Sequence, residues 1–178
     1  MRRLLGFGVA FALFGAACSS STSHTGSDAG SLSSGQTLED ASLIDGSDSL
    51  CATDPRAESF VSGIQAKGAS GAASVTIDSA TPSTPIKGNN EWIVSVTDAQ
   101  GAPLDGLTIT VSPFMPDHGH GSSITPQIAP LGGGKYDITL INLFMPGIWQ
   151  ITLTLATPGD GGQAQAIDSA VFTFCISG

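Results

Sequence analysis

Charged side chains are scarce in this 178-residue sequence, and positive ones are the scarcest. Only 12% of the residues are charged, and six Lys and Arg residues stand against fifteen Asp and Glu residues, for a net charge of −9. Two basic residues, Arg2 and Arg3, lie in a segment that we expect to be removed, and their loss takes the charge from −9 to −11. Such a surface repels phosphate groups, so the composition disfavours nucleic acid as a partner and favours small cations.

The N-terminal apolar run is too short to span a membrane. Residues 4–14 form a run of about eleven residues, whereas a transmembrane helix needs roughly 20. Arg2 and Arg3 precede this run and the small residues Gly15, Ala16 and Ala17 follow it. This is the pattern of a secretory signal peptide, which we place at residues 1–17.

Cys18 directly follows the predicted signal peptide. The stretch resembles the lipobox of bacterial lipoproteins, which implies that Cys18 carries the lipid and is the only attachment to a membrane. Gly15 departs from the leucine usual in the lipobox, and ordinary cleavage after Ala17 would instead give a secreted or periplasmic protein. The serines after Cys18 favour the outer membrane as the place of the anchor.

Cysteine is also rare, with three residues in the chain. An odd number in an exported protein leaves one cysteine to be explained, and lipidation of Cys18 accounts for it. Cys51 and Cys175 then remain as a predicted disulfide in an oxidising compartment, with two free thiols as the alternative.

Large apolar side chains are few between residues 18 and 50, which are mostly Ser, Thr, Gly and Asp. We expect a flexible tether there, followed by one domain over residues 51–178. Within that domain a short helix is expected near residues 56–64, and Trp92 and Trp149 are expected to pack in the core. Alternating apolar residues between Gly and Pro turns predict strands; they fall at 74–78, 91–97, 107–112, 124–129, 135–141, 149–155 and 170–176. About seven short strands of this spacing indicate an all-β, immunoglobulin-like β-sandwich.

Common catalytic motifs are missing. The sequence contains no Gly-x-Ser-x-Gly elbow, no His-Glu-x-x-His helix and no phosphate-binding glycine loop. We therefore expect a protein that is not an enzyme.

Potential metal ligands concentrate in one segment. His118 and His120 are separated by one residue, so in an extended chain both project to the same side. Met115 lies just before them, and Met145 stands in a second Phe-Met-Pro sequence thirty residues on. Imidazoles and thioethers suit a soft ion such as copper, and Asp117 would add an oxygen ligand for Cu(II) or Zn(II). The alternatives are surface histidines, core methionines and an aspartate that begins a turn.

These motifs together resemble the YtkA-like and FixH-like group of bacterial envelope domains. The residues that carry the resemblance are Met115-Pro116-Asp117-His118-Gly119-His120-Gly121, then Gly133-Gly134-Lys135-Tyr136, then Phe144-Met145-Pro146-Gly147-Ile148-Trp149. The resemblance covers about residues 86–155 and implies an immunoglobulin-like sandwich linked to copper handling and to the assembly of copper oxidases. FixH-type members carry a transmembrane helix, which a lipid on Cys18 would replace as the anchor.

The resulting hypothesis is a lipid-anchored protein of the bacterial envelope that binds copper or a similar soft metal as a buffer or chaperone. Its predicted ligands are His118, His120, Met115 and Met145. The alternative is an adhesion or assembly module that binds another envelope protein, with the histidines incidental.

Overall fold

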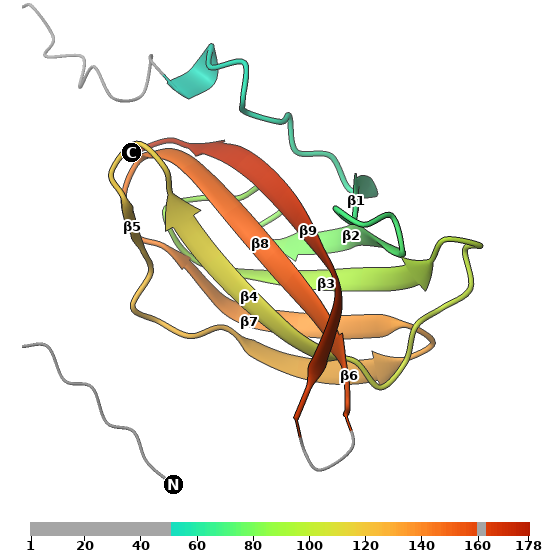
Figure 1. Cartoon of the computed structure of the whole chain (residues 1–178). Coiled ribbons are helices and arrows are strands. Elements are labelled where there is room, and N and C mark those ends of the chain that lie inside the picture. Colours follow the sequence, from blue (N-terminus) through green and yellow to red (C-terminus); the bar gives the residue numbers. More distant parts are fainter. Residues whose placement is uncertain (1–50, 160–162) are drawn as a thin grey trace, which may run out of the picture. The chain divides into compact units, whose positions relative to one another are not determined.

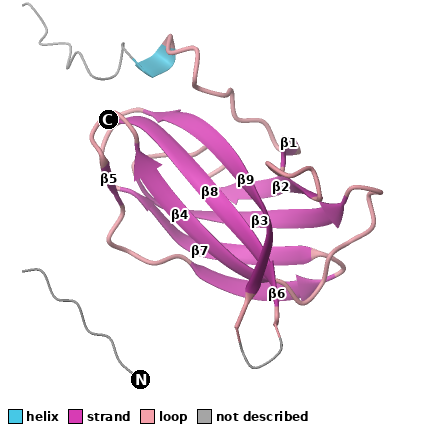
Figure 2. Ribbon diagram, in the orientation of Figure 1, coloured by secondary structure: helices cyan, strands magenta, loops and turns pink. Residues whose placement is uncertain are grey.

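Nine strands make up the part of the chain that the computed structural model describes, residues 51–159 and 163–178 (Figures 1 and 2). The strands are β1 (Ile64–Lys67), β2 (Ala73–Thr81), β3 (Gly88–Asp98), β4 (Thr108–Met115), β5 (His120–Gly121), β6 (Gln127–Gly132), β7 (Lys135–Leu143), β8 (Gly147–Thr157) and β9 (Gln165–Ile176). The predicted signal peptide, Cys18 and the predicted tether lie outside the described residues. No helix in the described ranges is long and apolar enough to cross a membrane.

The strands follow from alternation in the sequence. Along β4 every second residue is buried, and β2 and β7 show the same period over most of their length. A strand with this pattern presents one face to a core and the other to water. Both sheets therefore turn an apolar face inward, as a sandwich requires.

The two sheets have the strand order of an immunoglobulin domain. One sheet runs β1-β2-β3-β7-β6 and the other runs β5-β4-β8-β9, with antiparallel pairing throughout. If β2 is strand A, the chain order gives A-B-E-D facing C′-C-F-G, with β1 added beside A. The predicted all-β, immunoglobulin-like sandwich is confirmed.

Aromatic side chains from both sheets meet in the core. Trp92 of β3 contacts Phe172 and Phe174 of β9 edge to face, with ring centroids 6.0 and 5.9 Å apart. Trp92 and Trp149 are fully buried, which confirms their predicted place in the core. Tyr136 is buried too, and its hydroxyl donates to the Leu104 carbonyl and accepts from the Leu107 amide.

Asp168 links the two sheets at the β9 edge. Its carboxylate accepts hydrogen bonds from the backbone amides of Ser70, Ala73 and Ser169 at 2.8 to 2.9 Å. Ser70 lies in the turn between β1 and β2, and Ala73 is the first residue of β2. Gly68 lies so close that an added Cβ would meet the Asp168 carboxylate at 2.1 Å. The carboxylate thus replaces strand pairing where the two sheets meet.

All seven predicted strands are present, although the strand expected at 124–129 begins three residues later as β6. The short strands β1 and β5 were not predicted, because four and two residues are too few to show a clear period. The helix expected near residues 56–64 was wrong. This segment is a loop leading into β1 (Figure 2), and the Glu58 amide donates to the Thr173 carbonyl of β9.

The disulfide between Cys51 and Cys175 is confirmed. The Cα atoms of the two cysteines are 5.4 Å apart, and 124 positions separate them in the sequence. The bridge ties the start of the described chain to the end of β9.

Candidate metal centre

The predicted histidines flank the tight turn between β4 and β5 (Figure 1). The Met115 carbonyl accepts from the amides of His118 at 3.2 Å and Gly119 at 2.9 Å, which closes the turn. Gly119 has a φ of 69°, a conformation that glycine adopts without strain. The chain then re-enters the sheet at His120, which pairs directly with Met115.

The two imidazole rings lie next to each other. Their centroids are 5.7 Å apart, with His118 exposed and His120 half-buried. Two imidazoles on one ion keep their centroids about 5 to 6 Å apart, since each bound nitrogen lies about 2.0 Å from the metal. Among the hydrogen bonds between residues of the described ranges, none involves a ring nitrogen of His118 or His120.

The second Phe-Met-Pro segment lies beside the histidine turn. The Phe144 ring stacks on His120 with centroids 5.5 Å apart, and it meets Trp149 edge to face at 5.6 Å. The Trp149 indole donates to the Met145 carbonyl at 2.9 Å, which holds this loop against β8. Met145 itself is partly buried against the core. The structure therefore brings the two segments together at one end of the sandwich.

Met115 differs from the other three predicted ligands because its side chain is in the interior. It is 0% exposed, and a Cβ added to Gly147 would lie 2.8 Å from its terminal methyl carbon. Gly147 thus provides the space that Met115 fills. The thioether of Met115 would reach an ion at the rim only by leaving the core.

Asp117 is held by a guanidinium group. Arg56 Nη1 and Nη2 donate to the two Asp117 carboxylate oxygens at 2.7 and 2.8 Å. These hydrogen bonds lower the pKa of Asp117. Arg56 also donates to Asp54 from its backbone amide, Nε and Nη2, and those bonds lower the Asp54 pKa to about 2. Both carboxylates are therefore ionised at neutral pH, and both already accept hydrogen bonds from Arg56.

A small cavity lies beside His118, with a volume of about 210 Å³. Its walls come from three segments of the chain; they are Cys51, Asp54, Asp117, His118, Pro146, Gly147 and Ile148. Within the described ranges no three His, Cys, Asp or Glu side chains are grouped so as to hold a metal ion. The potential donors in neighbouring segments are the two imidazoles and the thioether of Met145, and such a set suits a soft ion better than zinc or calcium.

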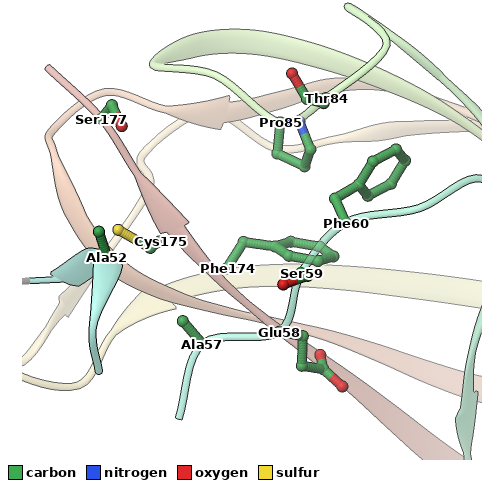
Figure 3. A pocket seen from close by; sticks show the side chains of 10 residues that line it. All are labelled: Ala52, Ala57, Glu58, Ser59, Phe60, Thr84, Pro85, Phe174, Cys175 and Ser177. Carbon is green, nitrogen blue, oxygen red and sulfur yellow. The ribbon is translucent and has the colours of Figure 1, made fainter. Parts of the chain in front are cut away.

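A second cavity, of about 310 Å³, has no such chemistry. Figure 3 shows the rings of Phe60 and Phe174 near Pro85, with the Cys175 sulfur toward the Ala52 end. Its one ionisable side chain, Glu58, accepts a hydrogen bond from the Thr173 amide at 2.8 Å. We assign no site there.

Arg56 is the residue of this region that the sequence did not reveal. It stands 61 positions before Asp117, in a stretch expected to be helical, and no motif connects the two. Only the fold places them in contact.

Comparison with protein families gives a match over the central part of the chain. The family model described as YtkA-like matches residues 69–154. No curated protein matches the chain. Among solved structures, the crystal structure of FetP from uropathogenic Escherichia coli, expressed in the periplasm of E. coli, has a TM-score of 0.38 and 13% identity to this chain. The alignment covers 68% of this chain and 95% of that one.

Proposed function

Because residues 69–154 form a YtkA-like domain with two adjacent histidines at its rim, we propose that this protein binds a soft metal ion, with copper as the first candidate. It would serve as a buffer or chaperone for that ion in the bacterial envelope. The proposal is of a binding protein and includes no catalytic step.

The observation that carries this proposal is the pair of imidazole rings with centroids 5.7 Å apart, next to a methionine-bearing loop. His118 and His120 would hold the ion. Met145 is the more accessible source of a thioether because it is only partly buried, whereas Met115 is fully buried in the core. A bound copper ion would prefer imidazole and thioether ligands to hard oxygen ligands.

The cellular location follows in part from the disulfide. Structural disulfides form in oxidising compartments, so the Cys51–Cys175 bridge indicates a place outside the cytoplasm. We propose in addition that Cys18 carries a lipid and anchors the chain, with the outer membrane favoured. Mass spectrometry of the intact protein tests this, because diacylation adds the mass of the lipid and a Cys18→Ser variant lacks it.

Titration of the purified protein with Ag(I), a redox-inert substitute for Cu(I), and with Cu(II) tests the proposed site. We expect about one bound equivalent, and a loss of affinity of about tenfold or more in a His118→Ala, His120→Ala double variant. His24, the third histidine of the sequence, stays in that variant and controls for nonspecific binding. Equal affinity of the two proteins for both ions would refute the proposal.

A second candidate function is favoured by one surface. The short strand β5 pairs with only the last two residues of β4, and the Ser122 amide bonds to the Pro113 carbonyl, so within the described part of the chain residues 108–112 of β4 form a free sheet edge. A cavity of about 410 Å³ lies along this edge, and Phe114 and Ile124 at its wall are 41% and 39% exposed. A free edge beside apolar side chains suits an extended segment of another protein.

This alternative proposes a module that assembles with another envelope protein. Crosslinking followed by pull-down would recover the partner in the presence of a metal chelator, and a Phe114→Ser, Ile124→Ser variant would lose it. A protein that stays without a partner while it binds Ag(I) would argue against this role.

A further inference from the structure

Arg56 and Asp117 form a contact that joins two distant parts of the chain beside the candidate metal centre. The guanidinium engages both carboxylate oxygens of Asp117, at 2.7 and 2.8 Å. Such a two-point contact is directional as well as electrostatic. Asp117 directly precedes His118 and lines the same cavity, so its carboxylate is the oxygen ligand nearest in sequence to the histidine pair.

Arg56 belongs to a segment that is attached to β9 at both of its ends. We call residues 51–58 the strap. Cys51 is bound covalently to Cys175, and Glu58 exchanges two hydrogen bonds with Thr173, at 2.7 and 2.8 Å. Between these points the Arg56 guanidinium also donates hydrogen bonds to the Asp54 carboxylate. The guanidinium is thus held in place by the strap and not by Asp117 alone.

Stability does not explain this arrangement. The Arg56 and Asp117 side chains are 43% and 49% exposed, and ion pairs of that exposure contribute little to folding. The contact has a clearer chemical consequence, because it occupies the carboxylate that directly precedes the histidine pair in the sequence.

We propose that Arg56 sets the metal preference of this site by holding the Asp117 carboxylate away from His118 and His120. This inference rests on the proposed function and adds to it a residue that determines specificity. With Asp117 engaged, the available donors are imidazole and thioether, which suit Cu(I). With Asp117 released, one carboxylate and two imidazoles stand within four residues, a donor set that Zn(II) accepts.

The test compares Zn(II) and Ag(I) affinities of the whole protein in competition with a chromophoric chelator. We expect Arg56→Ala to bind Zn(II) at least about tenfold more tightly than the wild type, and Arg56→Ala, Asp117→Asn to lose that gain. Lys87→Ala is the matched control. It removes one positive charge from an exposed lysine that forms no salt bridge among the described residues, and it should leave both affinities unchanged.

Hydrogen exchange of the metal-free protein separates ligand release from loosening of the turn. The His118 and Gly119 amides bond to the Met115 carbonyl and not to the strap. Their exchange rates should therefore be the same in Arg56→Ala and in the wild type. Faster exchange in the variant would overturn the inference, because Arg56 would then be holding the turn itself.

The outcomes distinguish this inference from the proposed function. A gain of Zn(II) affinity that depends on Asp117 supports the role of Arg56 even if the wild type binds no Ag(I), a result that refutes the proposed function alone. Ag(I) binding by the wild type with no Zn(II) gain in Arg56→Ala overturns the inference and leaves the proposed function standing. An equal gain in Lys87→Ala also overturns it, because net charge would then be the cause.

Discussion

Asp168 offers the sharpest test of how this sandwich is held together. Its side chain is buried, with 7% exposure, and its carboxylate accepts three backbone hydrogen bonds. If the carboxylate is removed, the backbone amides of Ser70 and Ser169 can hydrogen-bond to water instead, but the Ala73 amide is buried. Hydrogen bonds to a charged group contribute about 1.5 to 3 kcal/mol each and are not additive, so Asp168→Ala should lower the unfolding free energy by about 3 to 5 kcal/mol.

The same carboxylate makes stability depend on pH. Burial alone would raise the pKa of Asp168, but hydrogen bonds from the Ser70, Ala73 and Ser169 amides outweigh it and lower the pKa from 3.8 to about 2. Because the folded pKa is the lower one, this stabilisation is present above about pH 4 and is lost as the pH falls toward 2. It amounts to about 2 kcal/mol in full, of which about 1 kcal/mol is lost by pH 3.

Urea unfolding followed by tryptophan fluorescence measures both effects, since Trp92 and Trp149 are fully buried and report on the core. Asp168→Asn cannot ionise, so between pH 6 and pH 3 it should lose about 1 kcal/mol less than the wild type does. Glu91→Gln, at an exposed carboxylate, is the control and should behave as the wild type. The reasoning is refuted if the unfolding free energy of Asp168→Ala lies within about 1 kcal/mol of the wild-type value, which is the contribution of one ordinary hydrogen bond. It is also refuted if the stability of Asp168→Asn depends on pH as strongly as that of the wild type.

Three further predictions concern the covalent bridge and the packing beneath the rim. Replacing Cys51 and Cys175 with serine should lower the unfolding free energy by about 4 to 5 kcal/mol, because the bridge closes a loop of 124 positions; reductant should destabilise the wild type and leave this variant unchanged in urea unfolding. Gly147→Ala should cost about 1 to 3 kcal/mol, since its Cβ would meet Met115 at 2.8 Å and its φ is 127°. The two costs of Gly147→Ala and Met115→Ala should then be less than additive in a double-mutant cycle, and strict additivity would contradict the contact. Met115→Ala should cost about 2 to 5 kcal/mol by thermal or urea unfolding, and Met145→Ala clearly less, because only Met115 is fully buried.

Much of the fold could be read from local patterns. The period of two in strands such as β4 depends only on which residues are apolar, so seven strands and the sandwich class were predictable. Pairing of Cys51 with Cys175 followed from counting cysteines and considering the compartment. The closeness of His118 and His120 was also predicted, but for an extended segment; in the structure His118 lies in the turn over residues 116–119, and the turn brings the rings together.

Other features depended on contacts between residues far apart in the sequence. The segment at 56–64 had helix-compatible residues, yet the β9 edge offered it hydrogen bonds through Thr173, and the tertiary contact prevailed over the local preference. The burial of Met115 agrees with the alternation along β4, where it continues the buried positions Ile109 and Val111, but its contact with Gly147 depends on the fold.

The sequence by itself determined which residues could form strands, which cysteines could pair and where two imidazoles would lie together, because each of these depends on spacing along the chain. The tertiary structure alone decided that Arg56 bonds to Asp117 and that the Met115 side chain fills the space beside Gly147. Both contacts join residues far apart in the sequence, and neither leaves a periodic signal in the order of the residues.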